Sequence, residues 1–176
     1  MRTVERSQCT DLTGEKVILR CVEEQDREML ISLIQDPETI KITGGYPCPE
    51  TYDHQMSWFD APSDLGGNVR RIIADKAQPQ NGLGIIAFSG NGSQKQTAQI
   101  YIKLIKSARN RGYGQDAVRV FVSYGFHELQ LNRIFCRILE HNTASRKLFE
   151  KCGFCPEGLC KDHTYKYVLN TPADLL

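Results

Sequence analysis

The chain has 176 residues, of which 40% are hydrophobic and 24% charged, with a formal net charge of +1 at pH 7. This length and composition predict a single globular domain over residues 1–176. The basic residues cluster at one turn instead of forming a long stripe, which argues against a nucleic-acid-binding protein. No segment resembles a signal peptide or is apolar over the length of a bilayer, so we expect a cytoplasmic protein with no membrane partner.

The hydrophobic pattern of the first half predicts a helix followed by several strands. Residues 16–22 are typical of a strand, and residues 23–35 place apolar side chains at helical spacing up to a stop at Asp36-Pro37. The next predicted elements are a loop at 44–52, a short helix around 55–59, and three antiparallel strands at 68–75, 82–90 and 97–105.

The second half opens on a basic turn with two glycines, residues 109–114, which leads into an amphipathic helix that reaches residue 126. A strand at 133–139 follows. Asn142 is a good N-cap for another helix, which Gly153 ends. Two further strands are predicted at 154–158 and 164–170, which brings the total to about seven strands and four helices in mixed α/β order.

The turn at residues 109–114 is predicted to bind an anion through its main chain. Gly112 and Gly114 can adopt positive φ without a Cβ penalty, and amides from Asn110 onward can converge at the helix start, where phosphate is attracted. Between residues 103 and 119 there are five basic residues and one acidic residue, which favours a small polyanionic ligand. The sequence lacks the Lys-Ser/Thr pair of a nucleotide-hydrolase loop and the three-glycine dinucleotide motif, so neither site is predicted.

Seven cysteines lie at positions 9, 21, 48, 136, 152, 155 and 160. Because they are odd in number and scattered, we expect free thiols, as is usual in a reducing compartment. Cys152, Cys155 and Cys160 could form a zinc site together with His163. The helical spacing of Cys152 and Leu148 favours instead a buried thiol that packs as a small hydrophobic group, and we expect no metal.

Two motifs carry a family resemblance. The first, R-x-x-G-x-G, runs from Arg109 to Gly114, and the second, N-x-x-S-R-x-L-x-E-K-x-G-F, runs from Asn142 to Phe154. With the order of elements around them, they closely resemble the GNAT family of N-acetyltransferases. Residues 17–40 look like the opening of the branch with the ribosomal-protein N-terminal acetyltransferases (RimJ/RimL-like). The resemblance covers roughly residues 12–172.

This resemblance implies the α/β (α+β) GNAT fold: a mixed, mostly antiparallel seven-stranded sheet with about four helices, splayed between the fourth and fifth strands at 97–105 and 133–139. It implies an enzyme that transfers an acetyl group from acetyl-CoA, its cosubstrate, to a primary amine. The pyrophosphate would lie on the amides of the turn, and Lys106 would help to offset its charge. The implied coenzyme-binding residues are Ile102, Lys103, Leu104, Arg109, Asn110, Arg111, Gly112, Tyr113, Gly114 and Asn142.

Two positions depart from the family's pattern. Gln99 stands where many members have a glutamate base, and Phe149 where many have a tyrosine acid. Because a lysine-like amine has a pKa of about 10.4 and an α-amine about 8, an enzyme without a strong base should prefer the α-amine. Ser145 is a candidate proton donor to the leaving thiolate, as proposed in the ribosomal branch. It is equally typical of a first-turn helix serine bonded to backbone.

The acceptor is less defined by the sequence: a peptide or protein N-terminus is favoured, with a polyamine, amino acid or antibiotic as alternatives. A catalytically silent acyl-CoA-binding module is the rival from another class, and both a monomer and a homodimer are compatible with the chain. We expect acceptor selection from the loop at 44–52, the helix bearing His54 and Trp58, and residues 158–165. The side chains there that could orient a cationic amine are Glu50, Asp53, Asp162 and His163.

Overall fold

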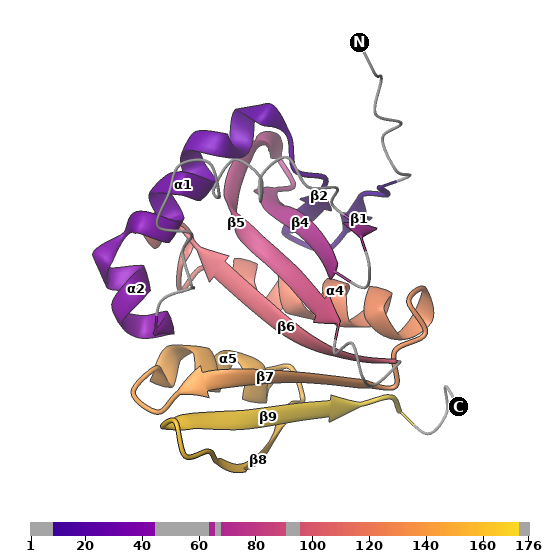
Figure 1. Ribbon diagram of the computed structural model, residues 1–176. Coiled ribbons are helices and arrows are strands. Elements are labelled where there is room, and N and C mark those ends of the chain that lie inside the picture. Colours follow the sequence, from indigo (N-terminus) through magenta and orange to yellow (C-terminus); the bar gives the residue numbers. More distant parts are fainter. Residues whose placement is uncertain (1–8, 45–63, 66–67, 91–95, 173–176) are drawn as a thin grey trace.

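The computed structural model describes residues 9–44, 64–65, 68–90 and 96–172, and the strands of these residues form one sheet (Figure 1). Its order is β1-β2-β4-β5-β6-β7-β9-β8, with β3 paired to β4. Every pair is antiparallel except β6 with β7. The strands are β1 (Leu12–Thr13), β2 (Val17–Arg20), β3 (Asp64–Leu65), β4 (Asn68–Asp75), β5 (Gln78–Gly90), β6 (Thr97–Leu104), β7 (Arg133–Leu139), β8 (Cys155–Leu159) and β9 (Thr164–Asn170).

The mixed, mostly antiparallel sheet is confirmed, and the described residues hold nine strands in place of about seven because of the two-residue strands β1 and β3. The same residues contain four α-helices, none of them long and apolar enough to cross a membrane. The helical elements are η1 (Glu24–Asp26), α1 (Arg27–Gln35), α2 (Pro37–Thr43), η2 (Lys106–Ala108), α4 (Tyr113–His127) and α5 (Thr143–Lys151).

Helices cover both faces of the sheet. Helix α4 lies behind the sheet in Figure 1, and its Phe121 ring stacks on Phe88 of β5 with ring centroids 4.2 Å apart. Gly125 of α4 is required there, because a Cβ would lie 2.9 Å from Phe88. On the opposite face, Met29 of α1 lies beside Ile72 and Gly82. Alternation along the strands thus separates a core under α4 from a second layer under α1.

The predicted elements are mostly found, with one split and one omission. Strands β4, β7 and β9 have the predicted bounds, whereas the helix predicted at 23–35 divides into η1 and α1. Helix α2 was not predicted, because Asp36-Pro37 was interpreted only as a stop. In the structure the Asp36 carboxylate accepts the Thr39 N–H at 2.7 Å and Pro37 occupies the first turn, so the pair starts a helix. The predicted short helix at 55–59 lies outside the described residues.

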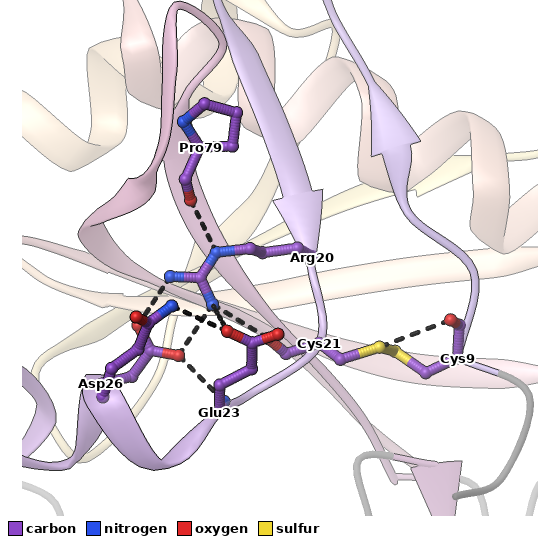
Figure 2. Close-up of polar contacts among 7 residues, drawn as sticks. Cys9, Arg20, Cys21, Glu23, Asp26 and Pro79 are labelled. Atoms are coloured by element: carbon purple, nitrogen blue, oxygen red, sulfur yellow. Dashed lines mark hydrogen bonds and ion pairs between the residues drawn. A yellow bond between two sulfur atoms is a disulfide. The ribbon is translucent and has the colours of Figure 1, made fainter.

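The expectation of free thiols is wrong for Cys9 and Cys21, which the structure joins in a disulfide (Figure 2). The pairing of Leu12 with Leu19 aligns β1 and β2 antiparallel. Cys9, which lies shortly before β1, therefore comes to lie beside Cys21, which follows β2. Spacing along the sequence does not reveal this approach. The described free cysteines are Cys136, Cys152, Cys155 and Cys160, and Cys48 lies outside the described residues.

A buried ion pair next to this disulfide fixes the start of the helical layer (Figure 2). The Arg20 guanidinium donates to both carboxylate oxygens of Asp26 at 2.7 Å, and its Nε donates to the Pro79 carbonyl oxygen. Both side chains are less than a tenth exposed. Since removing one partner would leave a buried charge without compensation, the pair locks η1 to β2 and β5.

Candidate active site

The sheet opens between β6 and β7, as predicted. These two strands pair only from Thr97↔Arg133 to Gln99↔Phe135. Beyond this point β6 continues beside β5, and β7 continues beside β9 to the pair of Leu139 with Thr164. The two strands therefore part, and a cavity of about 350 Å³ lies between them.

A larger cavity, of about 790 Å³, adjoins the first at the start of α4. It is lined by the end of β6, the turn before α4 and residues along the whole lengths of α2 and α5. The shared lining residues are Ile42, Thr43, Ile102, Lys103, Asn142 and Ser145. We call the larger space the outer cavity and the smaller one the inner cavity.

The turn before α4 presents its main chain to the outer cavity. Asn110 and Gly112 have φ values of 58° and 85°, and Gly112 is the N-cap of the helix. Because the first amides of a helix have no acceptor inside it, the N–H groups that follow Gly112 are available to an anion. Gly114 also lines the cavity, where a Cβ would come 3.3 Å from Leu104 and 3.4 Å from Leu148.

The Arg109 side chain holds elements together at the mouth of the outer cavity. Its Nη2 donates to the Thr39 hydroxyl at 2.9 Å, and its Nε donates to the Leu104 carbonyl oxygen at 3.1 Å. Glu38 lies 3.6 Å from the Arg109 guanidinium and 3.1 Å from Lys106 Nζ. These two cations are therefore partly neutralised by α2, a contact that the sequence did not reveal.

The side chains of Arg111 and Tyr113 lie on the other side of the turn, away from the outer cavity. They line a separate hollow together with Lys16 and Asp75. The Tyr113 hydroxyl donates to Asp75 at 2.7 Å, which lowers the pKa of Asp75, with a further contribution from the N–H of Ala77. The same bond raises the pKa of Tyr113. Only the main chain of these two residues remains close to the predicted pyrophosphate position.

Two lysines of α5 line the outer cavity and were missed by the sequence analysis. Lys147 and Lys151 are exposed, lie one turn apart and have no carboxylate partner among the described residues. Their spacing of four residues was the available signal, but it is equally typical of an ordinary solvated helix face. In the structure this face borders the turn that holds Asn110 and Gly112.

Asn142 and Ser145 lie where the two cavities meet. The Asn142 side chain accepts the Ser145 N–H at 3.1 Å and donates to the Ile42 carbonyl oxygen at 2.9 Å, so it caps α5 and joins it to α2. The Ser145 hydroxyl has no hydrogen-bond partner in the described part of the chain. It is half-buried and can donate into either space.

The described lining of the inner cavity lacks the side chains that usually act as a general base near pH 7. Gln99 and Phe149 both lie on its wall, and the Phe149 ring is buried edge-on against Phe154. Its described lining residues include no carboxylate and no histidine. Cys136 is also on the wall, and burial raises the pKa of its thiol far above the ordinary value, so it stays protonated and inert.

Asp162 and His163, candidate groups of the sequence analysis, have partners within the chain. Within the described residues no group of three or more His, Cys, Asp or Glu could hold a metal ion. Asp162 accepts from Thr164 and lies 3.4 Å from Arg137, while His163 is 3.8 Å from Glu140. The further acceptor-selecting candidates Glu50, Asp53, His54 and Trp58 lie outside the described residues.

Known proteins resemble this chain in sequence and in fold. The sequence profile of the family described as Acetyltransferase (GNAT) domain matches residues 16–155. The N-acetyltransferase p20 of Bacillus licheniformis is 28% identical over 86% of both chains, and YdaF of Bacillus subtilis, a candidate ribosomal N-acetyltransferase, is 26% identical over 86% of this chain and 85% of its own. The structure of spermidine N-acetyltransferase from Vibrio cholerae with CoA and spermine has a TM-score of 0.78 at 17% identity, covering 89% of this chain and 96% of that one.

Proposed function

We propose that this chain, which belongs to the GNAT family and is an N-acetyltransferase, transfers the acetyl group of acetyl-CoA to an α-amine. The observation that carries the proposal is the junction of the two cavities: main-chain donors at the start of α4 open into a space between two parted strands. A carrier that is anionic at one end and reactive at the other fits this arrangement. The family uses acetyl-CoA, whose pyrophosphate and thioester have these properties.

In this proposal the outer cavity holds the coenzyme. The amides of residues 110–114 bind the pyrophosphate, and the free edge of β6 at residues 102–104 pairs with the pantetheine amides. Lys147 and Lys151 add positive charge on the opposite wall, where Arg109 and Lys106 contribute less because of Glu38. Asn142 keeps α2 and α5 at the separation that leaves the cavity open.

The chemistry is attack of a neutral amine on the thioester carbonyl carbon. A C–N bond forms and the carbonyl oxygen becomes an oxyanion. The C–S bond then breaks as the thiolate leaves, the nitrogen gives one proton to water, and the thiolate takes one up, so the products are an amide and CoA thiol. A main-chain N–H near Lys103 or Leu104 is our candidate donor to the oxyanion. The Ser145 hydroxyl is the candidate donor to the thiolate, supported by its place at the junction and its lack of another partner among described residues.

The lack of a carboxylate or histidine in the described lining of the inner cavity supports an α-amine as acceptor. With Gln99 in place of a carboxylate, the enzyme must take the fraction of amine that is already neutral. That fraction is greater by more than two orders of magnitude for an amine of pKa about 8 than for one of about 10.4. The named activities of similar proteins point in different directions, to spermidine in one and to ribosomal protein in another, so they do not select the acceptor.

Release of CoA thiol with a panel of amines tests this proposal. We expect turnover with peptides that have a free N-terminus and much slower turnover with spermidine at about pH 7. Tight coenzyme binding without turnover of any amine would identify a silent binding module. Equal turnover of spermidine and α-amines would contradict the proposed acceptor class.

A further inference from the structure

The inner cavity carries positive charge on the face that α2 covers. Ile100 and Cys136 point into the core under α4, so alternation turns their strand neighbours Tyr101 and Arg137 to the opposite face. Among the described lining residues of this cavity two are charged, Lys103 and Arg137, and both are cations. A negative group on the acceptor can therefore be attracted to the Arg137 side of this cavity.

Arg137 is the more available of the two cations. Its side chain is 48% exposed, and its Nη1 lies 3.4 Å from a carboxylate oxygen of Asp162. That carboxylate already accepts a shorter bond, 2.6 Å, from the Thr164 hydroxyl. A guanidinium has five N–H donors, and in the described part of the chain only the contact with Asp162 engages Arg137. The remaining donors form a fork that matches a carboxylate.

From this geometry we infer that the acceptor is a peptide whose N-terminal residue is Asp or Glu, and that Arg137 binds the side-chain carboxylate of that residue. The inference rests on the proposed acetyl transfer and defines its substrate class further. An inner cavity of about 350 Å³ lies at the small end of ligand sites, which suits a single N-terminal residue. Binding the carboxylate at Arg137 would leave the amine facing the junction where Ser145 lies.

Acetylation of peptides with N-terminal Asp or Glu, and of matched peptides with N-terminal Asn or Gln, tests this inference. The exchange removes the carboxylate and also changes the amine pKa slightly, so rates must be divided by the concentration of neutral amine. We expect kcat/KM of the wild type to favour the Asp and Glu peptides by about tenfold to one-hundredfold, the range for a hydrogen bond to a charged group. In Arg137→Gln this preference should disappear through KM, while the Asn and Gln peptides react as in the wild type. Arg137→Lys should restore part of it.

Asp162→Asn is the matched control, because it breaks the same ion pair while leaving the guanidinium in place. We expect this variant to keep or increase the preference for carboxylates. An equal loss in Asp162→Asn and Arg137→Gln would show that the ion pair has only a structural role and would overturn the inference. Wild-type preference for the Asn and Gln peptides would overturn it too, with acetyl transfer itself intact. Failure of every amine, including peptides, would instead contradict the proposed function on which the inference rests.

Discussion

The outer and inner cavities are built from different parts of the polypeptide. The outer cavity offers main-chain groups at the start of α4, shaped by Gly112 and Gly114. The inner cavity offers side chains of β6 and β7, among them Gln99, Tyr101 and Arg137. Chains with different side chains can therefore keep the same coenzyme site while the acceptor site changes. Backbone substitutions should impair coenzyme binding, and side-chain substitutions should change acceptor choice.

The largest expected effect comes from Gly112→Ala. Gly112 has a φ of 85°, where an L side chain is strained, and relaxation of the turn would displace the amides that face the outer cavity. We predict a loss of about one-hundredfold in affinity for acetyl-CoA, measured by calorimetry. Gly153→Ala is the control, since Gly153 has a φ of 90° at the end of α5, away from the cavity lining. If both variants bind the coenzyme equally well, the main-chain site is refuted.

Gln99→Glu should increase activity, whereas Gly112→Ala decreases coenzyme affinity, because it adds a general base to the inner cavity. We predict a gain of about tenfold in kcat/KM for spermidine at about pH 7 and a smaller gain for an α-amino peptide, because the peptide is already largely neutral. Gln80→Glu adds the same charge on the exposed part of β5 and should change neither rate. A gain of equal size for both amines would mean that the missing base does not set acceptor choice. Coenzyme affinity should stay constant throughout.

Replacing either Lys147 or Lys151 with Ala should weaken acetyl-CoA binding by about threefold to tenfold. Each is an exposed cation on the wall of the outer cavity, where we propose that the coenzyme phosphates bind. The loss should shrink as salt is added, since exposed charges are screened. Lys161→Ala removes an exposed cation outside both cavities and should leave the binding constant unchanged. A loss that is independent of salt would indicate a packing role in place of an electrostatic one.

Asp75→Asn should have the smallest effect on coenzyme binding, because Asp75 lies on the far side of the turn from the outer cavity. Tyr113 lowers the pKa of Asp75 below its ordinary value of 3.8, so this carboxylate stabilises the fold above that value and loses its contribution as the pH falls through the folded-state pKa. The stability advantage of the wild type over Asp75→Asn should therefore shrink as the pH falls below about 4, as followed by thermal unfolding. An advantage that grows on acidification would contradict this assignment.

The sequence was sufficient for features set by local pattern. Strands β4 and β7 follow from their hydrophobic residues, and the turn before α4 follows from two glycines and a helix. Helix α2 was missed because Asp36-Pro37 was interpreted only as a stop, and the β-branched residues of its sequence, PETIKIT, have low helix propensity and give no helical signal of their own. Long-range contacts of its side chains with Arg109 and Lys106 help to place it, and no local pattern reports them.

The same distinction applies to the candidate site. Gly112 could be interpreted from the sequence, and it has the predicted positive φ, whereas Gly114 lies within α4 without it and Asn110 adopts positive φ instead. The direction of Arg109 could not be interpreted in this way, since its partners Thr39 and Glu38 lie about 70 residues earlier in the chain. Arg137 gave no signal either, because only the parting of β6 from β7 places it on a cavity wall.

The central claim is that main-chain donors at residues 110–114 bind the pyrophosphate of the coenzyme. The most direct test is calorimetry of wild type and Gly112→Ala with acetyl-CoA and with acetyl-pantetheine, which lacks the pyrophosphate. The account predicts that the substitution weakens acetyl-CoA binding about one-hundredfold and leaves the weaker binding of acetyl-pantetheine unchanged. An equal loss for both thioesters, or no loss for either, would contradict it.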